Sequence, residues 1–313
     1  MDRSQEQQRR VFRPSRRRPL PANPRSPRYW PLHAAAALAW LPARLPASLR
    51  RILGLALGRL LLRLSPRRRH IVDRNLAVCF PQQSRSEREA LLRSVFDSAG
   101  LGFTETLTAW FGAPDQARVT FEGLELLRDA RARGGVLLVG AHFATMELAG
   151  ALLSKQVPMD VIYRGNRNAG TDHILWKARR RHYDAVMERT ETRRILRRLR
   201  GGAIVWYAAD QDYGARHSQF ESFFGMPAAT INAAERLVTA SGAQTLAVSH
   251  FRCDGGQRWH LRIRPVEPHP AAINRWLEEE IRTAPEQYLW LHRRFKTRPP
   301  GAPSVYDAER PAG

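Results

Sequence analysis

The order of apolar and polar residues predicts a chain that alternates between short buried strands and amphipathic helices. Mostly apolar runs at Val136–Val139, Met159–Arg164 and Ala203–Ala209 have the length and β-branched content of strands covered on both faces. Two further strands, Thr245–Phe251 and Trp259–Ile263, flank the turn residues Asp254, Gly255 and Gly256, which predicts a hairpin.

Helical patterns lie between and around these strands. Residues from Phe143 onward continue the first strand as a helix, and Ser84 and Glu87 have the spacing of a capping box. The other predicted helices are Asp73–Phe80, Ser86–Leu107, Leu124–Arg133, Asp172–Tyr183, Glu191–Arg200, Ile231–Ser241 and Ala271–Thr283. Strands alternating with helices predict an α/β fold, with a mostly parallel mixed sheet flanked by helices on both faces.

The N-terminal part has a different pattern. Residues 1–28 contain nine arginines and few apolar residues, which predicts a disordered basic tail. Residues 29–66 contain an apolar stretch shorter than the roughly 20 residues that span a bilayer, followed by a leucine-rich helix interrupted by arginines. This composition favours a helical anchor lying at a membrane surface, and the alternative is a helical pair packed on a soluble core. Residues 67–306 are then expected to form the catalytic domain and 307–313 a short tail.

The charge changes this picture only in part. The chain of 313 residues has a formal net charge of +22, which favours polyanionic partners such as phosphorylated substrates, anionic lipid or nucleic acid. Only three of its 51 basic residues are lysines, so an arginine-biased genome is an alternative source of much of this charge. A nucleic-acid-binding protein is not expected, because no helix-turn-helix, aromatic platform or zinc module accompanies the arginines.

Two cysteines, Cys79 and Cys253, give neither a disulfide framework nor a thiolate set for zinc, so we expect a reducing compartment. A signal peptide is not expected either, because the first apolar stretch begins near Trp30, behind the basic tail. The sequence also lacks a phosphate-binding P-loop, a dinucleotide fingerprint, an H-E-x-x-H motif and a G-x-S-x-G elbow.

The stretch of residues 134–150 carries the strongest candidate chemistry. His142 follows a buried strand, at the sheet edge where ligands bind in α/β folds, and Glu147 lies five residues further on. Because a separation of five residues leaves two side chains well apart around a regular helix, they can converge only if His142 precedes the regular helix or the first turn is bent. A histidine oriented by a carboxylate is a general base, whereas a structural histidine and a helix-dipole glutamate are the alternative.

Charged residues also follow the other predicted strands. Arg164 ends the second strand, and Asp210 and Asp212 follow the third. Arg164 is expected to bind a phosphate or an oxyanion. Asp210 and Asp212 are grouped with Arg164 and Arg189 as residues that bind substrate or an oxyanion. The alternatives are that they hold a metal, orient Arg164 or simply begin a turn. Arg189 belongs to a basic group that is either a substrate-binding surface or a solvated helix face.

Phe223 and Phe224 are expected to form an apolar wall before a turn into the next helix.

Several motifs together carry a family resemblance. They are HIVDRNLAVCFP at 70–81, HFATMEL at 142–148, VIYRGN at 161–166, WYAADQDYG at 206–214 and APEQYLWLHRRFKTRP at 284–299. In this order they resemble the lipid A late acyltransferases of Gram-negative bacteria, the lauroyl and myristoyl type within the lysophospholipid acyltransferase superfamily. Gly165 and Arg167 depart from the family pattern.

The resemblance implies an enzyme on the cytoplasmic face of the inner membrane. It implies acyl transfer from acyl carrier protein, as co-substrate, to a hydroxyl on an acyl chain of a phosphorylated lipid A precursor, in lipopolysaccharide biosynthesis. His142 and Glu147 match the family's catalytic pair, with no acyl-enzyme, cofactor or metal expected. Arg164 matches its strand-end arginine, and Asp210 and Asp212 its acidic motif. Acyl transfer to a lysophospholipid, glycerol phosphate or an ornithine-type lipid is the alternative, and a silent membrane scaffold is disfavoured by the intact His142 and Glu147.

Overall fold

The computed structural model describes residues 26–307, so the tails predicted at 1–28 and 307–313 lie almost wholly outside the described residues. Its α-helices are α2 (Trp30–Leu38), α3 (Trp40–Arg44), α4 (Ala47–Leu64), α5 (Pro66–Cys79), α6 (Arg85–Phe111), α7 (Leu124–Arg133), α8 (Met146–Leu153), α9 (Ala169–Arg179), α10 (Thr192–Arg200), α11 (Ala233–Ser241) and α12 (Pro270–Thr283). Its strands are β1 (Val119–Glu122), β2 (Val136–Gly140), β3 (Met159–Tyr163), β4 (Val186–Glu188), β5 (Ile204–Ala208), β6 (Ser218–Phe223), β7 (Met226–Ile231), β8 (Gln244–Cys253) and β9 (Arg258–Pro265).

Seven of these strands form one mixed sheet in the order β1-β9-β8-β2-β5-β3-β4. Neighbouring strands are parallel except β8 and β9, which pair antiparallel as the predicted hairpin. The strand β2 lies between β8 and β5, and the register pairs Gly140 with Ala208. The α/β prediction is therefore confirmed, and the register brings the residues after β2 beside those after β5.

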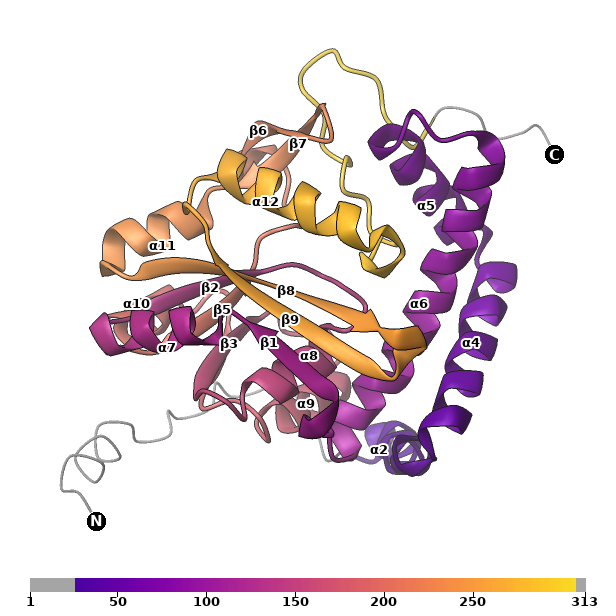
Figure 1. Cartoon of the computed structure of the whole chain (residues 1–313), viewed down its shortest axis with the longest axis horizontal. Coiled ribbons are helices and arrows are strands. Elements are labelled where there is room, and N and C mark those ends of the chain that lie inside the picture. The colour runs from indigo at the N-terminus through magenta and orange to yellow at the C-terminus, as the bar shows by residue number, and fades with distance from the viewer. Residues whose placement is uncertain (1–25, 308–313) are drawn as a thin grey trace.

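Helices cover both faces of the sheet, with α11 and α12 on one face and α7 and α8 on the other (Figure 1). Successive residues of β2 point to opposite cores: Leu137 and Val139 pack toward α10, α11 and α12, whereas Val136 and Leu138 pack toward α7 and α8. This two-sided burial is why the strand is apolar along its whole length.

The helix pattern of the sequence is largely confirmed, including the capping box, in which Ser84 accepts from the Glu87 backbone and Glu87 reaches back to Ser84. The expected turn into a helix after Phe223 is wrong. Phe224 and Gly225 both have positive φ and join β6 to β7 in a two-residue hairpin. The strands β1 and β4 were not predicted, because these edge strands of four and three residues are too short to show a period.

The N-terminal helices are fastened to the domain through α6. A Cβ atom at Gly100 would lie 2.1 Å from the carbonyl oxygen of Gly54, so glycine allows the backbones of α4 and α6 to touch. The large exposed apolar side chains of the described residues lie mainly on α2 to α4: Trp30, Leu38, Trp40, Leu41, Leu49, Ile52, Leu60, Leu61 and Leu64. In residues 26–307 no helix combines the length and the apolar content needed to cross a membrane.

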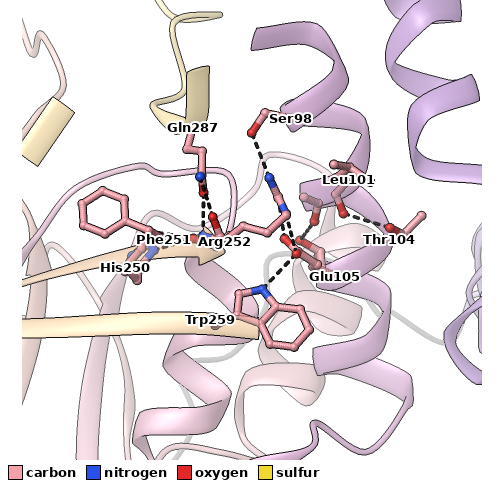
Figure 2. Close-up of polar contacts among 12 residues, drawn as sticks. Ser98, Leu101, Thr104, Glu105, His250, Phe251, Arg252, Trp259 and Gln287 are labelled. Carbon is pink, nitrogen blue, oxygen red and sulfur yellow. Dashed lines mark hydrogen bonds and ion pairs between the residues drawn. The ribbon is translucent and has the colours of Figure 1, made fainter. Parts of the chain in front are cut away.

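A buried ion pair ties α6 to the sheet. Arg252 at the end of β8 donates to both carboxylate oxygens of Glu105, at 2.8 and 2.7 Å, and Trp259 of β9 donates to the same carboxylate (Figure 2). The side chain of Gln287 donates to the carbonyl of Arg252 and accepts from its backbone N–H. This network joins α6, the β8–β9 hairpin and the segment that follows α12.

Candidate active site

His142 lies in a turn between β2 and α8. The helix begins at Met146, three residues after the predicted start, which confirms that His142 precedes the regular helix. The segment after α12 holds the turn: Leu289 N–H donates to the carbonyl of His142 at 2.9 Å, and Ala144 N–H donates to the carbonyl of Gln287 at 2.8 Å. The turn is therefore fixed by a segment more than 140 residues further along the chain.

Asp210 holds the imidazole. Its Oδ1 lies 2.7 Å from His142 Nδ1, and its Oδ2 accepts from the His142 backbone N–H at 3.0 Å. Each residue follows its strand by two positions, and the strands are paired at Gly140 and Ala208. Asp210 is 1 % exposed, so the carboxylate that we expected near substrate lies behind the histidine instead.

Tyr288 completes this arrangement from the segment after α12. Its hydroxyl donates to Asp210 Oδ2 at 3.0 Å, and the residue is buried. Burial raises the pKa of Tyr288, so the phenol keeps its proton. Tyr288 was not predicted as a site residue. It lies 146 residues after His142, and no local pattern around it indicates its contact with Asp210.

The electrostatics favour a basic imidazole. Burial lowers the pKa of His142, but the charge and hydrogen bond of Asp210 outweigh it and leave the pKa above its ordinary value. Burial likewise raises the pKa of Asp210, and the interaction with His142 brings it far below its ordinary value. The carboxylate is thus ionised, Nδ1 carries the proton, and Nε2 faces the pocket with Gln211 Nε2 at 3.3 Å.

Glu147 makes different contacts from those predicted. Its carboxylate accepts from Arg179 Nη2 at 2.5 Å and Nε at 3.1 Å, and from Trp110 Nε1 at 2.9 Å. Burial raises the pKa of Glu147, but Arg179 and Trp110 bring it below its ordinary value. The prediction that Glu147 orients His142 is therefore wrong: the bidentate guanidinium occupies the carboxylate, and Asp210 orients the imidazole.

The two predicted arginines line the same pocket as His142 and Glu147. Arg164 follows β3 and Arg189 follows β4, and both are exposed. The loop that carries Arg164 is shaped by Asp172, which accepts from Asn166 N–H at 2.8 Å. The guanidinium of Arg189 lies 5.3 Å from the ring centre of Tyr213, another residue of this wall. Two cations at the ends of neighbouring strands suit a phosphate or a developing oxyanion.

Asp212 does not line the pocket that holds His142, Arg164 and Arg189. Its Oδ2 accepts from Thr297 N–H at 2.6 Å, and its Oδ1 accepts from the Thr297 hydroxyl and Gly214 N–H, both at 2.8 Å. The prediction that Asp212 binds substrate or an oxyanion is wrong in its geometry, because both oxygens face protein donors. Asp212 fastens the C-terminal segment to the loop after β5.

The pocket has a volume of about 260 Å³ and runs between the sheet and helices α8 and α9. Its lining combines polar side chains, among them His142, Glu147, Arg164, Arg179 and Arg189, with apolar side chains from β3, β5, β8 and α8 that include Leu153, Met159, Trp206 and Val248. Within residues 26–307 no group of three or more His, Cys, Asp or Glu side chains is placed to hold a metal ion. The arrangement can bind an apolar chain and deprotonate a hydroxyl at one end of it.

The chain is similar to proteins of known activity along most of its length. A family model described as bacterial lipid A biosynthesis acyltransferase matches residues 22–297. The lipid A biosynthesis lauroyltransferase of Escherichia coli (strain K12) is 40% identical over 294 residues, which cover 90% of this chain and 96% of the relative. The palmitoleoyltransferase of the same organism is 38% identical over 292 residues, covering 90% and 95%, and its myristoyltransferase is 29% identical over 300 residues, covering 90% and 92%.

Proposed function

Since the chain belongs to the family of bacterial lipid A biosynthesis acyltransferases and is an acyltransferase, we propose that it adds a secondary fatty acyl chain to a lipid A precursor. The donor is an acyl thioester of acyl carrier protein, and the acceptor is a hydroxyl on an acyl chain that the precursor already carries. The observation that carries this proposal is His142 at the pocket wall, with Nδ1 held by the buried Asp210.

His142 is the general base of the proposed reaction. Its Nε2 takes the proton of the acceptor hydroxyl while the oxygen attacks the thioester carbonyl carbon, and Asp210 stabilises the imidazolium that forms. When the tetrahedral intermediate collapses, the carbon–sulfur bond breaks and the thiolate takes the proton from His142. The oxygen of the acceptor becomes the ester oxygen, so no acyl-enzyme is needed. Cys79 and Cys253 do not line the pocket.

The arginines give the site its positive charge. Arg164 and Arg189, exposed at the pocket, are placed to pair with phosphates of donor or acceptor. Glu147 holds Arg179 rigidly in the wall and accepts from Trp110, so we assign it a supporting part in the catalytic site. The apolar side chains that line the pocket suit the acyl chain of the donor, because binding there removes the chain from water.

We also propose that the protein works at the cytoplasmic face of the inner membrane. The exposed apolar side chains of α2, α3 and α4 would enter the interface of the bilayer, and the arginines between them would pair with anionic headgroups. The net charge of +22 favours such a surface and an acidic carrier protein.

The proposal is tested by mass spectrometry of lipid A from cells with and without the protein. A mass increase equal to one acyl chain is expected only when the protein is present, and fragmentation places that chain as a secondary ester. In vitro, the purified protein is given acyl carrier protein thioester with the precursor, a lysophospholipid, glycerol phosphate or an ornithine-type lipid. Faster transfer to any of the last three would overturn the assignment of the acceptor.

Replacing the base tests the mechanism separately. We expect His142→Ala to lose nearly all turnover while its folding and membrane association stay as in the wild type, since the side chain is at the pocket and partly exposed. Wild-type activity in this variant would exclude His142 as the base.

A further inference from the structure

A second hollow, of about 490 Å³, lies against a different face of α9 from the catalytic pocket. Leu175 and Arg179 of this helix line the catalytic pocket, whereas Ile174, Lys177 and Ala178 line the second hollow. Its opposite wall is formed by α2 and α3, and its end by the last residues of α6. We call it the α2–α9 groove.

The groove is apolar within and basic in its charge. Trp40, Trp110, Phe111 and Ile174 give it aromatic and aliphatic walls, while Lys177 and Arg181 add cations that are exposed to solvent. No aspartate or glutamate is among the described residues that line it. Apolar walls beside cations and without acids complement a lipid that carries both an acyl chain and a phosphate.

The position of the groove connects two surfaces that the reaction needs. On the outer side, the helices α2 and α3 that line the groove also carry the exposed Trp30, Leu38 and Leu41. On the inner side it shares Trp110 with the catalytic site, because that indole lines the groove and donates to Glu147. A lipid seated in the groove would therefore reach from the apolar surface to the edge of the catalytic pocket.

We infer that the α2–α9 groove binds an acyl chain of the lipid acceptor, with Lys177 and Arg181 pairing with a phosphate of the same molecule. This inference rests on the proposed function, in which the acceptor is a phosphorylated lipid with several acyl chains. The catalytic pocket takes the donor chain and the hydroxyl-bearing end of the acceptor. The groove keeps another chain of the acceptor out of water and in a fixed place next to the catalytic pocket.

Filling the groove with a large side chain tests the inference, and the four successive alanines of α2 provide a variant with a matched control. Ala37 lines the groove and Ala35 does not, although both are exposed positions of the same helix. We expect Ala37→Trp to raise the KM for the lipid A precursor about ten-fold, with the KM for the acyl carrier protein thioester unchanged. Ala35→Trp should change neither value. Equal acceptor KM values in the two variants would overturn the inference.

A charge variant covers the case in which Ala37→Trp does not fold. Lys177→Glu should raise the acceptor KM in the same direction, because it places a carboxylate beside the phosphate. Arg236→Glu, an exposed position on α11, makes the same change of charge away from the groove and should leave the acceptor KM unchanged. An equal effect of the two charge variants would assign the result to net charge alone and reject the groove.

Binding is measured without turnover by photocrosslinking. The full chain with His142→Ala, in vesicles of phosphatidylethanolamine and phosphatidylglycerol, receives a precursor with a diazirine at the end of one acyl chain. Crosslinks to peptides that contain residues 36–40, 110–111 or 174–181 are expected, and unlabelled precursor should suppress them. Equal labelling by a diazirine phosphatidylglycerol would make the groove a site for membrane phospholipid and contradict the inference.

The crosslinking experiment and the acyl-transfer assay together separate this inference from the proposed function. Crosslinking in the groove without acyl transfer by the wild-type protein would reject the proposed function and keep the site. Acyl transfer without crosslinking in the groove would reject the site and keep the function.

Discussion

Asp210 and Asp212 follow the same strand, β5, but their carboxylates bind different partners. Asp210 is buried against His142 and Tyr288, while Asp212 accepts from Thr297 and Gly214. The two carboxylates are only two residues apart, so replacing each by asparagine compares a charge behind the imidazole with a charge in a loop contact.

We expect Asp210→Asn to lower kcat by about 10²–10⁴-fold, because the amide neither fixes the Nδ1–H tautomer nor stabilises the imidazolium. Asp212→Asn should keep most of kcat and lower the thermal midpoint, because it weakens the attachment of Thr297. Steady-state kinetics and thermal denaturation in detergent measure both. A larger loss of kcat in Asp212→Asn than in Asp210→Asn would contradict these assignments.

The pH dependence of kcat/KM provides a second test at the residue scale. The base acts when neutral, so the rate should rise with pH through the pKa of His142, with a midpoint above the ordinary value of about 6.5. Asp210→Asn removes the charge that favours the imidazolium, so the residual activity should rise at lower pH than in the wild type.

Tyr288→Phe should move the midpoint in the opposite direction. Without the hydroxyl that donates to Oδ2, the Asp210 carboxylate is less satisfied and attracts the imidazolium more strongly, which raises the pKa of His142. The profile should therefore shift to higher pH. A purely structural effect of Tyr288 would lower the rate without moving the midpoint, so an unmoved midpoint would reject this positioning role.

At the scale of elements, α6 connects the N-terminal helices to the sheet through one buried ion pair. The side chains of Arg252 and Glu105 are only 6% and 11% exposed, and Ser98 of the same helix also accepts from Arg252. Beyond Arg252, the Gln287 contacts lead directly to the segment that holds the His142 turn (Figure 2). The packing of α6 and the shape of the active-site turn therefore depend on one network.

We expect Glu105→Gln to destabilise the fold by about 3–5 kcal/mol, because it leaves the Arg252 guanidinium buried without a counter-charge. Glu89→Gln is the control on the same helix. Glu89 pairs with the exposed Arg69 and Arg93, and its loss should cost about 1 kcal/mol or less. The midpoints of urea denaturation measure the difference, and equal midpoints would show that the buried pair contributes nothing beyond an exposed one.

At the scale of the whole molecule, the exposed large apolar side chains are unevenly distributed. They gather on α2 to α4, whereas Leu126 is the only one of them on α7 among the described residues. Contiguous apolar surface of this kind marks an interaction site, whereas a single exposed leucine needs no explanation.

We expect Ile52→Glu and Leu60→Glu on α4 each to lower binding to vesicles of phosphatidylethanolamine and phosphatidylglycerol by about ten-fold or more, since each removes apolar burial worth roughly 1.5–3 kcal/mol. Leu126→Glu makes the same change on α7 and should leave binding unchanged. Co-sedimentation measures all three. Equal loss in the three variants would show that net charge, rather than the surface of α4, decides binding.

The sequence determined most elements of this fold and one residue of the candidate pair His142 and Asp210. Buried strands are apolar throughout, helices show their period and caps, and His142 follows a strand, because these signals are local. Arg164 also lies where its strand end predicted, on the wall of the same pocket. Arg189, which the sequence placed only in a basic group, lines that pocket because it follows the unpredicted strand β4.

Only the tertiary structure decided which carboxylate meets the histidine. Spacing along the chain favoured Glu147, five residues away, but the order of strands places β5 beside β2 and pairs Gly140 with Ala208, so Asp210 lies opposite His142. Glu147 meets Arg179 and Trp110, which come from α9 and α6, and Tyr288 comes from the segment after α12. Strand order and helix packing are set by contacts across the whole chain, and no local pattern contains them.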